Sequence, residues 1–206
     1  MTAQGTGSIT EYGNAVPYTG KLQTLGQFEV SAVTEQALRN DQVKVLESAA
    51  GDQFAASDFV AVCVSTASTT ISTSGTASAT ATADLSAYNV RYIVDYMKKK
   101  LIPKYDGQNY VCVASTAALS GMHADSAAGG WADAVKYTPA AVQNLLNGEV
   151  GTFYGCRFLE ETGYLSNTIG SSSIYGQAVF MGADAVYEAI ATPEEIRLKE
   201  AKLVFA

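Results

Sequence analysis

Charged residues are scarce in this chain of 206 residues. They make up 16% of it, well below the quarter that is usual for a globular domain. This shortage excludes a coiled coil and a charge-rich disordered chain. Alanine, glycine, serine and threonine together supply 86 residues, and hydrophobic residues supply 48%. The composition indicates a protein that buries much of its surface, either in a core or against copies of itself.

Histidine occurs once and cysteine three times, which leaves few groups for catalysis. A nucleophilic triad would have to use His123, in a loop rich in glycine and alanine with Asp125 two residues on, and no G-x-S-x-G motif accompanies it. The cysteines, Cys63, Cys112 and Cys156, are odd in number and widely spaced. They fit neither a disulfide framework nor a zinc site, so we predict buried thiols in strands.

Basic residues are fewer than acidic ones, 13 against 20, and the net charge is −7. A nucleic-acid surface along the whole chain is therefore excluded. One basic cluster exists, formed by Lys98, Lys99, Lys100 and Lys104. The dipole at the C-terminus of a helix explains these lysines, and DNA or phosphate binding is the alternative. The sequence shows neither a signal peptide nor an apolar run long enough for a membrane span, which indicates folding in a cytoplasm.

Two other sequence patterns are similar to a phosphate-binding motif and to a pair of catalytic acids, but neither matches. The segment G-E-V-G-T-F-Y-G (Gly148–Gly155) is neither a dinucleotide-binding nor a P-loop motif. The acid pairs Glu160-Glu161 and Glu194-Glu195 are better explained as solvated or interfacial groups than as a general acid and base. We therefore predict no catalytic, cofactor-binding or metal-binding residue, no cofactor and no enzymatic activity.

Apolar residues at helical spacing predict a long helix over residues 29–57, starting at Ser31 or Thr34. Gly51 would interrupt this helix or mark its end. A second helix is predicted over residues 84–101. Asp84 would be its N-cap, and one of its faces would carry three tyrosines: Tyr88, Tyr92 and Tyr96.

Residues 59–83, which lie between Asp58 and Asp84, include no charged residue. F-V-A-V-C-V predicts a buried strand, and the following Ser/Thr/Ala-rich stretch predicts a β-hairpin turning near Ser74-Gly75. A low-complexity linker is the alternative for that stretch.

Further along, Y-V-C-V-A predicts a strand and A-L-S-G-M-H-A-D-S-A-A-G-G-W (Ala118–Trp131) a loop. Helices are predicted from Thr138-Pro139 to Gly148 and in G-A-D-A-V-Y-E-A-I, with strands in the glycine-broken segment after Gly148 and in Q-A-V-F-M. About four helices and at least six short strands, in no repeating βα order, predict an α+β fold.

Several segments resemble, in order, the tailed-phage major capsid proteins related to the major head protein of phage N4. They are I-T-E-Y-G-N-A-V-P-Y-T-G-K-L (Ile9–Leu22), Leu38–Glu47, Leu101–Ala114, Trp131 with Tyr137-Thr138, G-E-V-G-T-F-Y-G-C-R-F-L-E-E-T (Gly148–Thr162) and Phe180–Ala189. The likeness covers about 190 residues, and its most specific part is the block from Gly148 to Thr162. Family members are usually longer at both ends, so the resemblance implies that this chain is the core of a longer subunit.

The resemblance implies an HK97-like fold. Residues 1–22 would form an N-terminal arm or strand, and residues 23–60 a peripheral domain with a long spine helix. Residues 61–181 would form the axial domain, and residues 182–206 would return to the peripheral domain.

The function implied is that of a major capsid subunit that assembles into the icosahedral head around phage DNA. Its partners would be copies of itself in pentamers and hexamers, together with scaffolding, portal and decoration proteins. The packaged DNA would be contacted non-specifically, and no membrane would be bound. The protein would be made in the cytoplasm of a host bacterium and would end in the virion. The tyrosines and the Ser/Thr-rich segment leave an alternative, a carbohydrate- or receptor-binding surface module.

Overall fold

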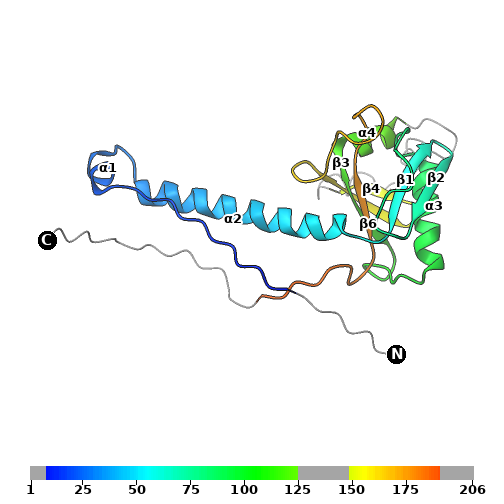
Figure 1. The fold of residues 1–206 in the computed structure, drawn as a ribbon, viewed down its shortest axis with the longest axis horizontal. Helices are drawn as coiled ribbons and strands as arrows, with labels where there is room; N and C mark the ends of the chain where they lie inside the picture. The colour runs from blue at the N-terminus through cyan, green and yellow to red at the C-terminus, as the bar shows by residue number, and fades with distance from the viewer. Residues whose placement is uncertain (1–7, 125–148, 191–206) are drawn as a thin grey trace. The chain divides into compact units, whose positions relative to one another are not determined.

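A computed structural model describes residues 8–124 and 149–190 of the chain (Figure 1). Helices and strands are mixed without a repeating βα order, which confirms the α+β class. The chain divides into two compact units, one formed by Met1–Ala49 with Tyr187–Ala206 and the other by Ala50–Val186. Of the sequence features predicted above, Trp131, the helix from Thr138 and the Glu194-Glu195 pair lie outside the described residues.

Residues 8–19 form neither helix nor strand, and they lead into the short helix α1 (Gly20–Leu25). Thr19 caps this helix. Its hydroxyl oxygen accepts a hydrogen bond from the Leu22 amide at 3.4 Å, which satisfies one of the unpaired donors of the first turn.

Helix α2 (Val30–Ala55) confirms the predicted long helix, although it begins before both expected N-caps. It continues through Gly51, where the sequence suggested an interruption. A Cβ atom at this position would overlap the ring of Tyr164, so the glycine allows the ring to pack against the helix backbone. The contact with the Tyr164 ring therefore explains a glycine inside this helix, despite the low helix propensity of glycine.

Strands β1 (Val60–Ser65) and β2 (Ser68–Ser72) form a hairpin that turns at Thr66-Ala67. The strand predicted in F-V-A-V-C-V is confirmed, but only Val62 of β1 is buried. The expected turn at Ser74-Gly75 is wrong. The later Ser/Thr-rich stretch forms no strand of its own and is tied to β1 through Thr82. The Thr82 amide donates to the carbonyl of Cys63 at 3.1 Å, and its hydroxyl donates to the carbonyl of Val64 at 2.6 Å.

Helix α3 (Ala87–Lys99) starts later than predicted. Its N-cap is Ser86, whose hydroxyl accepts from the Asn89 amide at 3.3 Å, so the assignment of Asp84 as the cap is wrong. Lys98 and Lys99 occupy the last turn, as the helix-end explanation predicted.

A four-stranded mixed sheet has the order β4-β5-β3-β6, formed by β4 (Glu149–Phe153), β5 (Cys156–Glu161), β3 (Tyr110–Ser115) and β6 (Ala178–Met181). Strands β3 and β5 are parallel, and the other two pairings are antiparallel. Tyr154 and Gly155 join β4 to β5 with positive φ values of 52° and 78°, the conformation of a tight hairpin turn.

Two predictions for this region are wrong. A-L-S-G-M-H belongs to helix α4 (Thr116–His123) instead of a loop, and its residues Ala118, Leu119 and Met122 are buried. The predicted short helix after β6 is absent from the described residues 182–190. There the Ala183 amide donates to the Pro103 carbonyl at 3.1 Å, and Asp184 has a φ of 53°, which a helix does not allow.

The core lies between one face of the sheet and the helices α3 and α4, which Figure 1 shows beside the sheet. Tyr110, Cys112 and Ala114 alternate along β3 toward this core, and Phe158 of β5 lies opposite Cys112. Helix α3 contributes a buried face formed by Val90, Ile93, Val94 and Met97. No helix in the described part of the chain is both long and apolar enough to cross a membrane.

Candidate functional site

The cysteines provide no reactive thiol. Cys112 and Cys156 are fully buried as predicted, whereas Cys63 is only half-buried. Burial raises the pKa of Cys63 to about 11, although a hydrogen bond with Asn89 opposes the shift. Burial, together with the neighbouring Cys156, raises the pKa of Cys112 well above its ordinary value. Since the thiolate is the nucleophilic form, these environments do not support catalysis by cysteine.

The only histidine is also poorly placed for catalysis. His123 is the last residue of α4, its side chain is exposed, and Asp125 lies outside the described residues. Within residues 8–124 and 149–190, no three His, Cys, Asp or Glu side chains gather in a way that could hold a metal ion.

The acid pair Glu160-Glu161 has a structural role at the end of β5. Glu160 accepts a hydrogen bond from the Thr116 hydroxyl at 2.8 Å. The Glu161 carboxylate accepts from three successive backbone amides, those of Gly163, Tyr164 and Leu165, at 2.5 to 2.8 Å. Burial alone would raise the pKa of Glu161, but these three hydrogen bonds lower it by more, so the net shift is downward. The carboxylate therefore holds the loop after β5 in place.

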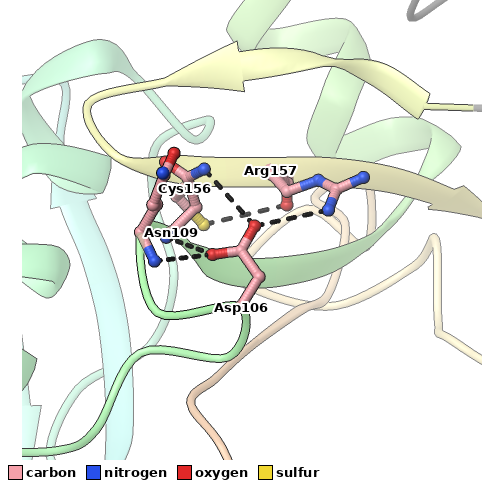
Figure 2. A network of polar contacts seen from close by, with 5 residues as sticks. Asp106, Asn109, Cys156 and Arg157 are labelled. Atoms are coloured by element: carbon pink, nitrogen blue, oxygen red, sulfur yellow. Dashed lines mark hydrogen bonds and ion pairs between the residues drawn. The ribbon is translucent and has the colours of Figure 1, made fainter.

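A second carboxylate organises the turn before β3 (Figure 2). Asp106 accepts from the backbone amides of Asn109, at 2.5 Å, and Gln108, at 2.9 Å, and it lies 3.4 Å from the guanidinium of Arg157. These hydrogen bonds, led by that of Asn109, lower the pKa of Asp106 to about 2. The contact with Arg157 connects this turn to β5. Figure 2 also draws Cys156, whose Sγ atom makes a long contact of 3.9 Å with the backbone carbonyl of Arg157.

Two of the three tyrosines predicted on one face of α3, Tyr88 and Tyr92, are exposed, whereas Tyr96 is half-buried and its ring meets that of Phe59 edge-on at 6.0 Å. Tyr88 and Tyr92 are 46% and 42% exposed, and their rings stack with centroids 6.3 Å apart at an interplanar angle of 16°. They project from the helix face opposite to the buried one. An exposed aromatic pair of this kind on a folded unit is typical of an interaction surface.

Exposed basic side chains lie along α3 near Tyr88 and Tyr92. Tyr154, at the β4–β5 turn, carries two of them over its ring, with Lys98 Nζ at 4.9 Å and the Arg91 guanidinium at 5.5 Å from the ring centroid. Lys98 also lies 3.4 Å from the carboxylate of Asp95. We call the exposed set the α3 outer surface, formed by Tyr88, Arg91, Tyr92, Lys98, Lys99 and Tyr154.

Sequence reasoning found only part of this surface. It noted the tyrosines of the helix and explained the lysines by the helix dipole, but it missed Arg91 and Tyr154. The available signals were the spacing of Tyr88, Arg91 and Tyr92 along one helix face and the Tyr154-Gly155 turn, whose tip can present an aromatic ring.

Helix α2 provides a second exposed region. Among its 26 residues only Val30 and Gly51 are buried. Val33 and Val43 are each more than half exposed, at 55% and 54%, and Leu46 is 39% exposed. These side chains are spread along the helix and do not form one stripe, but a helix of 26 residues that buries only two of them gains little packing within the described chain.

The comparisons with known proteins add no relative. No family model, curated protein or solved structure matches this sequence at a significant level. The function is therefore argued from the residues and surfaces described above.

Proposed function

We propose that this chain is a structural assembly protein, and specifically the major capsid subunit of a tailed phage, with an HK97-like fold that packs against copies of itself in an icosahedral head enclosing DNA. The observation that carries the proposal is the exposure of α2, a 26-residue helix that buries only Val30 and Gly51 within its own chain. Helices in proteins gain most of their stability from packing an apolar face. Contacts with other copies would supply that packing.

Three further features support this role. The chain is poor in charged residues and contains twelve tyrosines, a composition that resembles the cores of protein interfaces. Its ordered sequence resemblance to the capsid family includes Leu38–Glu47 within α2 and both strands of the β4–β5 hairpin. The ionisable groups with shifted pKa values serve folding, because the Asp106 and Glu161 carboxylates cap backbone turns.

The packaged DNA would be contacted non-specifically, and scaffolding, portal and decoration proteins would be the other partners. Many modest contacts, each repeated by symmetry, would sum to a closed shell. The virion would be the final location of the protein.

Negative-stain electron microscopy of the purified chain tests this proposal, alone and with a scaffolding protein encoded beside it. Rings or shells of regular size are expected. Monomers at every protein and salt concentration in both preparations would contradict the proposal.

Carbohydrate or receptor binding is the competing function, and the exposed rings of Tyr88 and Tyr92 are its best support. A sugar platform needs an open aromatic face. Arg91 and Lys98 cover the ring of Tyr154, and Tyr88 and Tyr92 stack on each other, so these contacts favour a protein interface. Specific binding on a glycan array, abolished by Tyr92→Ala, would reverse this preference.

A further inference from the structure

The charge of this chain is unevenly distributed. The segment from Arg91 to Lys104 holds five basic side chains and one acidic, a net charge of +4. Because the whole chain carries −7, the remainder carries −11. One short segment is thus strongly basic in an otherwise acidic protein, and its field would attract an acidic partner.

The α3 outer surface presents part of this positive charge together with aromatic rings. Arg91, Lys98 and Lys99 are exposed on α3, among the half-exposed rings of Tyr88 and Tyr92. Arginine and tyrosine are enriched in the centres of protein interfaces, where both supply contact area and hydrogen bonds. The combination is that of a docking surface for a protein with acidic groups.

A nucleic acid fits this surface less well. Bases stack on open aromatic rings, but Lys98 and Arg91 lie over the ring of Tyr154. Duplex DNA presents a charged backbone that would gain little from the exposed rings of Tyr88 and Tyr92. A partner with both acidic and apolar groups would use the whole surface.

We propose that the α3 outer surface binds the acidic surface of a second copy of this chain. This inference rests on the proposed function and names one interface that carries it. A second copy offers a net charge of −11 outside its own basic segment. Two such basic segments repel each other, so a two-fold contact of this surface with itself is disfavoured. The contact is therefore head-to-tail, and repetition of such a contact closes into a ring or extends into an open array.

Charge reversal tests the surface. In Arg91→Glu/Lys98→Glu, the net charge changes by −4, and the Kd of self-association measured by sedimentation velocity is expected to rise about tenfold or more, because like charges would then face each other. The matched control is Lys21→Glu/Gln23→Glu/Gln27→Glu, with the same charge change of −4 at exposed residues in and just after α1, outside both α2 and α3. The control should keep self-association within about threefold of the unaltered chain. Circular dichroism and thermal unfolding of both variants show whether the fold is retained.

Photo-crosslinking identifies the occupant. Tyr92 is replaced by p-benzoylphenylalanine in a ¹⁵N-labelled chain, which is mixed with unlabelled chain and irradiated. Mixed-isotope crosslinks to an acidic segment are expected, and they should weaken as salt rises from 0.05 to about 0.5 M. Crosslinks to an added DNA duplex in place of the second copy would overturn the proposal.

The two proposals fail in different ways. If the unaltered chain assembles and Arg91→Glu/Lys98→Glu assembles equally well, this interface is wrong while the structural function stands. If the unaltered chain never self-associates, the structural function itself is contradicted, and this inference falls with it.

Discussion

Helices α2 and α3 differ in how much of each is buried within the chain. Helix α3 has a face of four buried apolar residues, led by Val90 and Val94, which are fully buried. Helix α2 is twice as long and buries only Val30 and Gly51. Amphipathic packing against the sheet therefore stabilises α3, whereas little within the described chain stabilises most of α2.

The difference separates two kinds of stability. The residues around α3 form a core that one copy can complete, while the exposed apolar side chains of α2 would gain most from another molecule. We therefore expect changes in α3 to affect the folding of the single chain and changes in α2 to affect its assembly.

The largest effect is expected from a buried methionine of α3. Met97→Ala should lower the free energy of unfolding by about 2–5 kcal/mol, because it leaves a cavity against the sheet. Leu46→Ala in α2 is the matched change at an exposed site, and it should change the free energy of unfolding by no more than about 0.5 kcal/mol. Urea unfolding of the dissociated chain measures both. Equal losses would contradict the contrast between the two helices.

A smaller effect is expected at Gly51, the buried point near the end of α2. Gly51→Ala raises helix propensity by about 1 kcal/mol, but its Cβ overlaps the Tyr164 ring. Overpacking costs about 1–3 kcal/mol, so a net loss of up to about 2 kcal/mol is expected. In a Tyr164→Ala background the same change should instead stabilise the chain. Stabilisation in both backgrounds would show that the ring does not pack on this helix.

The smallest effect concerns the loop that carries Tyr164. Glu161→Gln should lower the free energy of unfolding by about 1 kcal/mol at pH 7, because three amides then lose a charged acceptor although the Gln carbonyl oxygen can still accept. The pKa of Glu161 is depressed in the folded chain, so its contribution is full above the unfolded pKa of about 4.5 and is lost as pH falls through the folded pKa.

The free energies of unfolding of Glu161→Gln and of the unaltered chain should therefore converge as the pH falls below 4.5 and through the lower pKa of the folded chain. Glu160→Gln, which loses a single contact with Thr116, is the control at the adjacent position. A difference in free energy of unfolding between Glu161→Gln and the unaltered chain that does not shrink as the pH falls from 7 to below 4.5 would contradict the role assigned to this carboxylate.

Sequence periodicity predicted the helices and strands whose local residue pattern agrees with their tertiary packing. The long helix, the strands at Tyr110 and Ala178 and the α+β class were all recovered, because local pattern and tertiary packing agree there. The helix ends were less accurate. Ser86 and Asp84 are equally good N-cap residues by type, and the structure selects Ser86.

The errors fall where tertiary contacts outweigh local preference. The glycine- and alanine-rich composition after β3 suggested a loop, yet Thr116–His123 forms α4 because its apolar residues pack on the sheet. The segment after β6 has helical composition, but its hydrogen bond to Pro103 holds it in another conformation. The α3 outer surface could be predicted only in part, since Tyr154 meets Arg91 and Lys98 through the fold rather than through the sequence.

Hydrogen–deuterium exchange, followed by mass spectrometry on dissociated and assembled protein, tests the central claim most directly. In the dissociated chain, the amides of β3 and the buried turns of α3 should be protected while those of α2 exchange rapidly. Assembly should slow the exchange of α2 by at least about tenfold and leave β3 nearly unchanged. Equal protection of α2 in both states would contradict the account, because it would show that this helix is stable without another copy.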